Sequence, residues 1–259
     1  MVNIKLNNKL PAPWIIGHRG YPAKYPENTL ASFQGAIDAG ASMIELDVML
    51  SADRKPVVIH DETLERTTDG RGAVAQRALA ELKQLDAGSW YHPRFAGQRL
   101  PELGEVLDLV NRRIYINIEI KSSAYESHHP ADAIEAQVVE LLRQKQLVDN
   151  SMISSFNTAV LERVASIQDA PIIAFISDKA ADGNTVAICS RLKTFSWHPD
   201  QAVVTRGQVR EMHAAGIKVF PYSVNTLADC EKMVAMEVDG VITDDPVSAA
   251  EWSRAQKAA

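Results

Sequence analysis

Short apolar runs alternate with amphipathic segments along most of the 259-residue chain. Eight compact runs rich in Val and Ile predict strands, and stretches with apolar residues three and four positions apart predict helices. The predicted strands are Trp14–His18, Met43–Val48, Ile114–Ile120, Met152–Ser155, Ile172–Ile176, Thr194–Trp197, Lys218–Tyr222 and Gly240–Thr243. The predicted helices include Thr29–Ala39, Asp132–Gln146, Thr158–Ile167, Thr205–Ala215 and Thr226–Met236.

Apolar strands that alternate with helices are typical of a parallel sheet whose faces are covered by helices. Eight strand–helix units predict an α/β fold of the (β/α)₈ TIM-barrel type, which commonly has about 250 residues. An open, doubly wound sheet is the alternative arrangement of the same units.

The interval from Asp61 to Arg113 does not follow this regular spacing. It contains several turn signals, such as Asp69-Gly70 and Pro101, and a short helix pattern at Leu79–Leu85 before the segment Leu103–Val110. We therefore expect one domain over residues 1–259, with a small inserted subdomain at about residues 61–113, after the second strand region, packed over one end of the barrel.

Composition excludes several classes of protein. The chain has 27 Lys and Arg against 33 Asp and Glu, so its net charge is −6, and it has no run of basic residues. Sequence-independent binding of nucleic acid or of anionic lipid needs clustered positive charge, so we expect neither. The two cysteines, Cys189 and Cys230, make no disulfide framework and no metal-binding pair, which suits a reducing compartment.

Targeting signals are also missing from the sequence. Residues 1–11 contain no apolar run of the length that a secretory signal needs, and nowhere do 18 apolar residues follow one another. We expect a cytoplasmic protein without a membrane anchor.

Two carboxylates lie close together on the second predicted strand. Side chains alternate across a strand, so Glu45 and Asp47 share one face while Ile44 and Leu46 take the other. In a barrel both carboxylates would point inward, where two like charges repel unless a cation offsets them. Carboxylate oxygens suit a hard divalent ion, Mg²⁺ or Ca²⁺. The alternative is a solvent-facing pair on an edge strand.

The third predicted strand repeats this pattern. Asn117, Glu119 and Lys121 share one face, and isoleucines occupy the other. Glu119 is therefore a candidate third metal ligand, and Lys121 is a fixed positive charge closer to the rim. A solvated surface strand is the alternative, but the isoleucines favour burial against helices.

Two histidines follow apolar runs and are candidates for proton transfer. His18 and Arg19 end the first predicted strand, where Arg19 can clamp a phosphate or carboxylate, and His60 follows the run from Val57 to Ile59. A surface or structural histidine is the alternative for each. Near a metal and Arg19, the two imidazoles could act as an acid/base pair. The other five histidines receive no role, although His198 follows a predicted strand and could line the rim.

The order of the short motifs resembles the glycerophosphodiester phosphodiesterase family, and within it the small cytoplasmic bacterial enzymes. The resemblance runs from about residue 14 to residue 246. Its motifs are Gly17–Gly20, Pro26–Leu30, Glu45–Val48, His60–Thr68, Asp86–Tyr91, Glu119–Lys121, Ser154–Phe156 and Gly240–Pro246. Each motif is weakly specific, but their joint order and spacing are highly specific.

The resemblance implies metal-dependent hydrolysis of glycerophosphodiesters to sn-glycerol 3-phosphate and an alcohol. It implies acid/base catalysis by His18 and His60, with Arg19 and Lys121 on the phosphate. It also implies one divalent cation, Mg²⁺ or Ca²⁺, at the positions of Glu45, Asp47 and Glu119.

One position departs from the family. The chain has Tyr222 followed by Ser-Val-Asn where the family commonly has tryptophan before Thr-Val-Asn. That position resembles a wall for the glycerol end of the substrate, so the departure affects substrate fit.

Three other functions fit parts of the pattern. A lysophospholipase D-like phosphodiesterase would act on membrane lipid. A barrel lyase or aldolase would use Lys121 as a Schiff-base amine, but three inward carboxylates would surround it. A non-catalytic phosphodiester-binding barrel would lack one acid/base residue, and here both His18 and His60 are present. For partners we expect a small-molecule substrate, no nucleic acid and a monomer or homodimer.

Overall fold

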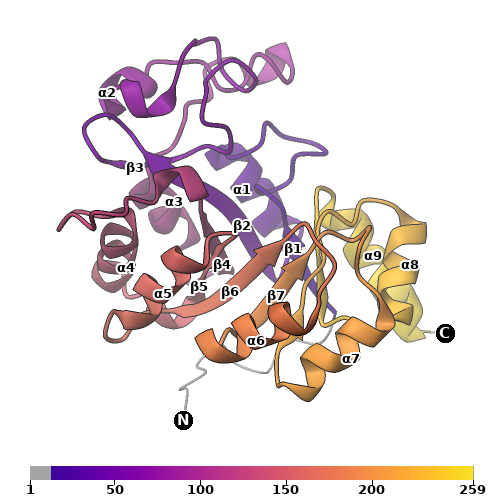
Figure 1. Ribbon diagram of the computed structural model, residues 1–259. Coiled ribbons are helices and arrows are strands. Elements are labelled where there is room, and N and C mark those ends of the chain that lie inside the picture. Colours follow the sequence, from indigo (N-terminus) through magenta and orange to yellow (C-terminus); the bar gives the residue numbers. More distant parts are fainter. Residues whose placement is uncertain (1–12, 259) are drawn as a thin grey trace.

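A nearly closed barrel of eight parallel strands forms the centre of the molecule, with helices on its outside (Figure 1). The computed structural model describes residues 13–258. The barrel strands are β1 (Trp14–Gly17), β2 (Met43–Leu50), β4 (Tyr115–Ile120), β5 (Ser151–Ser155), β6 (Ile172–Ser177), β7 (Ser196–Pro199), β8 (Lys218–Val219) and β9 (Gly240–Thr243). All eight overlap predicted strands. The predicted TIM barrel is confirmed, and the open sheet is excluded.

The barrel closes between β8 and β9 through single hydrogen bonds instead of a regular ladder. The Asp239 amide donates to the Val219 carbonyl at 3.1 Å, and the Ile242 amide donates to the Pro221 carbonyl at 2.9 Å. The Val224 amide completes the seam by donating to the Ile242 carbonyl at 2.8 Å. The residues that follow the short strand β8 therefore continue the pairing with β9.

A ninth strand, β3 (Pro56–Val58), lies antiparallel to the end of β2. β2 is long enough to extend past the barrel, and the chain then turns back so that Val58 pairs with Val48. The Ile59 amide donates to the Asp47 carbonyl at 3.1 Å. This short hairpin, which the strand prediction does not name, brings the next residue, His60, to the carboxyl end of the barrel.

The five named helix predictions are confirmed to within a few residues. The helices of the outer layer are α1 (Leu30–Asp38), α3 (Leu103–Val110), α4 (Ile134–Gln144), α5 (Thr158–Ser166), α6 (Gly183–Leu192), α7 (Arg206–Ala214), α8 (Leu227–Ala235) and α9 (Pro246–Ala258). The sequence prediction does not name α6, which begins with glycine and contains the β-branched residues Thr185, Val186 and Ile188. These residues have weak helix propensity. Burial of Thr185, Cys189 and Leu192 stabilises the helix instead.

The segment between β3 and α3 forms the irregular lobe at the top of Figure 1. It contains α2 (Leu79–Leu82) and the 3₁₀ turns η1 (Val74–Gln76) and η2 (Pro93–Phe95). Helix α3 falls inside the predicted insertion of residues 61–113, yet it packs against α1, α4 and β3 in the outer layer. The part outside the helix layer therefore ends before α3. The division into one domain with an insertion stays a prediction.

Among residues 13–258, no helix combines the length and the apolar composition needed to cross a bilayer. The N-terminal residues on which the expectation of no secretory signal depends lie outside the described residues. Cys189 and Cys230 are both buried free thiols.

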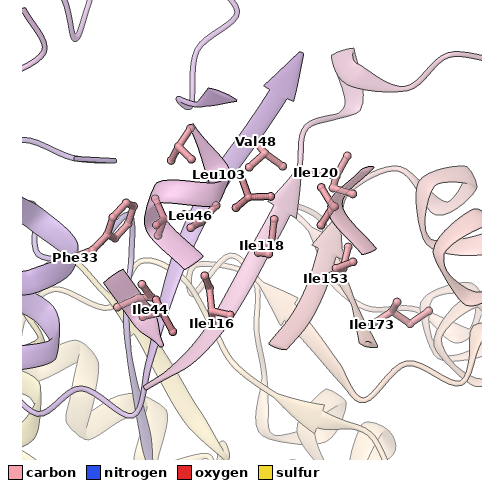
Figure 2. Close-up of a cluster of buried hydrophobic side chains, with 14 of the residues drawn as sticks. Phe33, Ile44, Leu46, Val48, Leu103, Ile116, Ile118, Ile120, Ile153 and Ile173 are labelled. Carbon is pink, nitrogen blue, oxygen red and sulfur yellow. The ribbon is translucent and has the colours of Figure 1, made fainter. Parts of the chain in front are cut away.

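The barrel strands separate two apolar clusters. Outward-facing residues such as Leu46 and Ile118 pack under the helices (Figure 2). A second cluster fills the lower barrel interior, with Trp14 stacked between Tyr115 and Phe220. Its buried members are Trp14, Ile16, Met43, Met152, Ala174, Phe195, Phe220 and Ile242. Because this inner cluster closes the barrel from below, the next inward side chains along each strand face the carboxyl end.

Candidate active site

Three carboxylates converge inside the barrel at its carboxyl end. Glu45 and Asp47 follow Met43 as successive inward residues of β2, and Asp47 pairs in register with Glu119 of β4. One carboxylate oxygen from each of the three lies within 4.8 Å of the other two, and all three side chains are buried. The inward parity predicted from the alternation of β2 and β4 is what brings these groups together.

Burial and crowding disturb the ionisation of these groups. Burial and the charges of its carboxylate neighbours raise the pKa of Glu45 well above its usual range, and burial and Asp47 also raise the pKa of Glu119. Asp47 behaves in the opposite way. Burial opposes its ionisation, but Lys121 and Arg19 outweigh that effect and hold its pKa low. The triad therefore needs positive charge to stay fully ionised.

Lys121 and Arg19 supply part of that charge. The Lys121 ammonium donates to Glu119 Oε1 at 2.9 Å and to Asp47 Oδ1 at 3.3 Å. The Arg19 backbone amide donates to Glu45 Oε2 at 2.8 Å, and its Nε lies 3.5 Å from Asp47 Oδ2. Asn28 donates to the same Asp47 oxygen at 2.9 Å. Both cations thus lie beside the carboxylates and line the cavity described below.

The turn after β1 sets the direction of Arg19. Gly20 has a φ of +94°, and a Cβ at this position would lie 2.4 Å from Ser32 Oγ. Only glycine fits this close approach. Ser32 Oγ in turn donates to the Arg19 carbonyl at 2.9 Å, so α1 holds the turn in place.

His18 is oriented by a carboxylate from the other end of the chain. Its Nδ1 lies 2.7 Å from Asp244 Oδ1 and 3.2 Å from Ser223 Oγ. Asn225 donates to the second oxygen of Asp244 at 2.6 Å. An acceptor at Nδ1 favours the tautomer in which Nδ1 carries the proton and Nε2 is free. Because His18 lines the cavity, Nε2 is the nitrogen available for proton transfer.

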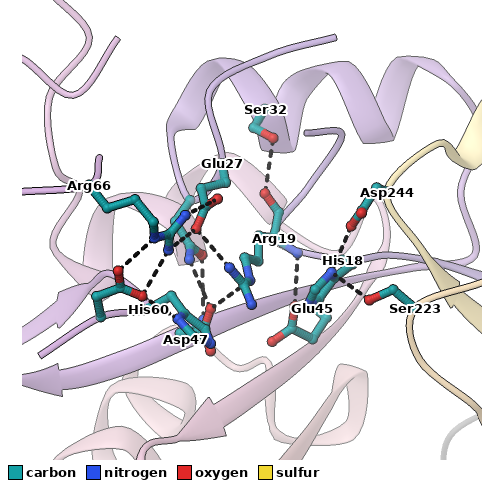
Figure 3. Close-up of polar contacts among 12 residues, drawn as sticks. His18, Arg19, Glu27, Ser32, Glu45, Asp47, His60, Arg66, Ser223 and Asp244 are labelled. Carbon is teal, nitrogen blue, oxygen red and sulfur yellow. Dashed lines mark hydrogen bonds and ion pairs between the residues drawn. The ribbon is translucent and has the colours of Figure 1, made fainter. Parts of the chain in front are cut away.

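His60 has a matching partner on the opposite side of the site (Figure 3). Its Nδ1 lies 2.6 Å from Asp61 Oδ1. Burial lowers the pKa of His60, and Arg19 and Lys121 lower it further, while Asp47 opposes the shift. The imidazole is therefore neutral near pH 7, with Nε2 unprotonated if Nδ1 donates to Asp61. That state is the one a general base needs.

Arg66 connects this histidine with Arg19. It donates to both oxygens of Asp61, from Nε at 2.6 Å and from Nη2 at 2.9 Å. It also donates to both oxygens of Glu27, at 2.8 and 2.9 Å, and Glu27 accepts from Arg19 at 2.9 Å. One guanidinium from the lobe therefore positions the partner of His60 and the partner of Arg19 together.

These groups surround a cavity of about 190 Å³. Its lining combines the charged residues above with apolar side chains such as Ile176 and Ile242. Tyr222 also lines the cavity, and its ring meets Phe156 edge-on at a centroid distance of 6.3 Å. Seven of the eight candidate residues line the cavity: His18, Arg19, Glu45, His60, Glu119, Lys121 and Tyr222. The eighth, Asp47, forms ion pairs with two of them, Lys121 and Arg19.

Sequence reasoning did not assign roles to several neighbours of these residues. Asp244, Asp61, Glu27 and Arg66 all occur within the motifs, but their functions depend on contacts between distant segments. His198 is the clearest case, because its position after a predicted strand indicates only a place at the rim. It is buried inside the barrel, 1% exposed, and lines the cavity.

The sequence model of the glycerophosphoryl diester phosphodiesterase family matches residues 18–248. The chain belongs to that family. The resemblance inferred from the motifs is thus confirmed, and the chain is an enzyme of the glycerophosphodiester phosphodiesterase class.

Relatives and solved structures of this family align over nearly the whole chain. A glycerophosphodiester phosphodiesterase of Caldanaerobacter subterraneus is 37% identical over 233 residues, covering 90% of this chain and 94% of the relative. One from Bacillus subtilis is 32% identical, covering 89% and 83%. The structure of an Oleispira antarctica phosphodiesterase in complex with its product sn-glycerol-3-phosphate has a TM-score of 0.85 and 32% identity, covering 93% and 97%.

Proposed function

We propose that the chain hydrolyses small glycerophosphodiesters to sn-glycerol 3-phosphate and the head-group alcohol, with one divalent cation held by Glu45, Asp47 and Glu119. The observation that carries the proposal is the buried carboxylate triad flanked, in one cavity, by two histidines that each bond an aspartate. The sn-glycerol 3-phosphate product of the Oleispira phosphodiesterase supports the same product here.

The donor set fits a hard divalent cation. Three ionised carboxylates and the two cations Arg19 and Lys121 sum to −3 + 2 = −1. That net charge would repel a phosphodiester anion, whereas a bound divalent ion changes it to −1 + 2 = +1. Oxygen ligands suit Mg²⁺ or Ca²⁺. When bound, such an ion offsets the charge that develops on the phosphoryl oxygens.

Side chains of the protein would bind the phosphate and transfer the protons. The Arg19 and Lys121 side chains would donate to the phosphate oxygens and hold the phosphorus between the two histidines. One imidazole takes a proton from the nucleophile. Attack by water gives sn-glycerol 3-phosphate directly, whereas attack by the neighbouring hydroxyl of the glycerol gives a cyclic phosphate that a water molecule then opens to sn-glycerol 3-phosphate. The other imidazole gives a proton to the departing alkoxide as its bond to phosphorus breaks. Asp61 and Asp244 keep each ring in the tautomer that these transfers need.

Metal depletion and re-addition tests this proposal directly. Glycerophosphocholine is the substrate, and sn-glycerol 3-phosphate is detected by a coupled assay. We expect product formation to stop after dialysis against a chelator and to return with Mg²⁺ or Ca²⁺ but not with a monovalent salt. Full product formation by the chelated enzyme would contradict the metal dependence, and no product under any metal would contradict the activity.

Head groups are expected to differ only modestly as substrates. The cations and the metal ligands hold the glycerol–phosphate half, so the departing alcohol is limited mainly by space at the rim. We expect kcat/KM for glycerophosphocholine and glycerophosphoethanolamine to agree within about 10-fold, the scale of ordinary pocket contacts. Steady-state kinetics under matched metal conditions measures this ratio.

A membrane lysolipid is expected to be a poor substrate in the same assay. Its acyl chain needs a continuous apolar surface. Among the side chains that the structure describes, the exposed large apolar ones are Trp90, Phe156 and Leu227, on three separate segments. A higher kcat/KM for lysophosphatidylcholine would move the chain to the lysophospholipase D class. The cytoplasmic location and the monomeric or homodimeric state stay predictions.

A further inference from the structure

Two neutral polar side chains at the floor of the cavity leave polar atoms without a hydrogen-bond partner. Asn117 leaves both Oδ1 and Nδ2 unpaired, and His198 leaves Nδ1 unpaired. Each residue is 1% exposed, and each lines the cavity. Buried polar atoms in native proteins nearly always have a partner, so three unpaired atoms on two residues that line one cavity point to a bound group.

The floor lies one layer of side chains below the catalytic groups. Asn117 pairs in register with Glu45 and precedes Glu119 by two residues on the same face of β4. His198 comes from β7 across the barrel, and its ring lies 5.6 Å from that of Phe220 in the apolar cluster beneath. The two residues therefore lie between the charged residues above and the inner apolar cluster below.

The chemistry of the floor suits an uncharged group. His198 Nε2 lies 2.9 Å from Ser196 Oγ, and that hydroxyl also reaches the sulfur of Met152 at 3.4 Å. Burial lowers the pKa of His198 to about 3, so the ring is neutral at pH 7. The unpaired Nδ1 is a donor in the tautomer in which it carries the proton and an acceptor in the other tautomer. With the amide of Asn117, the floor can both donate to and accept from a hydroxyl.

We infer that Asn117 and His198 form a subsite for a neutral alcohol hydroxyl, the terminal hydroxyl of the glycerol half of the substrate. This inference rests on the proposed function. With the phosphate beside Arg19 and Lys121, the terminal hydroxyl is the glycerol atom furthest from phosphorus and so reaches deepest. Asn117 and His198 line the same cavity of about 190 Å³ as Arg19 and Lys121.

The charged ends of the substrate do not fit this floor. A quaternary ammonium cannot donate a hydrogen bond to Asn117 or His198, and neither residue carries a positive charge for a phosphate. The head group is therefore directed outward. An ordered water is the competing occupant, and it would satisfy the same atoms without giving any preference among substrates.

The test compares glycerophosphocholine with its analogue lacking the terminal hydroxyl, the choline phosphodiester of 1,2-propanediol. The analogue keeps the hydroxyl next to the phosphate ester, so the chemistry is unchanged. We expect kcat/KM of the wild-type enzyme to be about 10- to 100-fold lower for the analogue, because the floor atoms lose their partner. Calorimetry with sn-glycerol 3-phosphate and 1,2-propanediol phosphate should give the same ratio in affinity.

Two variants assign this preference to the floor. His198→Phe should lower kcat/KM for glycerophosphocholine to the level of the analogue. Its kcat/KM for the analogue should stay within about 3-fold of the wild-type value. His198→Asn should keep part of the preference for glycerophosphocholine. His213→Asn is the matched control, because His213 lies on helix α7, bonds Asp239 and does not line the cavity. If His198→Phe does not fold, Asn117→Leu takes its place.

Several outcomes would overturn the subsite. Equal kcat/KM for the two substrates in the wild type would mean that water occupies the floor. An equal loss on both substrates in His198→Phe would mean that the residue only supports the fold. A wild-type enzyme that releases no sn-glycerol 3-phosphate would instead refute the proposed function, and the calorimetric ratio would then decide the subsite alone.

Discussion

Alanine at His18 or at His60 is expected to lower the turnover of glycerophosphocholine by about 10² to 10⁴, the usual contribution of a general acid or base. Each ring lies at the edge of the cavity with its Nδ1 bonded to an aspartate, so its loss removes a proton-transfer group. Neither ring belongs to the apolar core, since the His18 and His60 side chains are 18% and 32% exposed. Circular dichroism should therefore show an unchanged fold.

A substrate with an acidic phenol as leaving group separates the two roles. Such a phenolate leaves without being protonated, so the variant that lacks the general acid should recover most of its rate on this substrate. The variant that lacks the general base should not recover. His213→Ala is the control, because that ring bonds Asp239 on the outside of the barrel. Near-normal turnover by both cavity variants, with an unchanged pH–rate profile, would exclude the acid/base pair.

Glu119→Gln is expected to weaken divalent-cation affinity by more than about 100-fold. Loss of a residue that only supports a metal ligand costs up to about 100-fold, and loss of a ligand itself should cost more. The substitution keeps the shape of the side chain and removes one of three carboxylate ligands. Titration calorimetry with Mg²⁺ and Ca²⁺ measures the change. Unchanged affinity in Glu119→Gln, Glu45→Gln and Asp47→Asn alike would show that the cation does not bind at this triad.

Stability without metal distinguishes a lost ligand from a damaged fold. Burial and Asp47 raise the pKa of Glu119 in the folded chain, so at pH 7, above the unfolded pKa, its ionised form costs stability. Glu119→Gln should therefore unfold at the same or a higher temperature than the metal-free wild type. The wild type should gain about 5 to 10 °C in Tm at a cation concentration of about 100 Kd, and the variant should gain almost none.

Local periodicity determined the barrel strands and the inward carboxylates. The alternation of side chains along a strand depends only on backbone geometry, so Glu45, Asp47 and Glu119 could be assigned to one interior from sequence alone. The amphipathic helices were predicted for the same reason. Where the local signal was weak, as in α6, burial against the barrel decided the structure instead.

The motifs of the sequence also determined the family, because their joint order is specific even though each one is short. They could not assign the partners of the candidate catalytic groups. Asp244 reaches His18 across 226 residues of chain, and Arg66 reaches Glu27 across 39. Such pairs form only when the barrel closes and the lobe packs on it. Neither event produces a periodic pattern in the sequence from which the pairs could be predicted.

His198 shows the same division most clearly. Its place after a predicted strand was visible in the sequence, but the side of the strand that faces the interior and the depth of each layer depend on how neighbouring strands pair. In the folded chain β7 directs the ring inward, between the carboxylates and the inner apolar cluster. The sequence by itself determined which residues share one face of a strand. The tertiary structure decided which face points into the barrel and which side chains meet there, because both depend on register and closure.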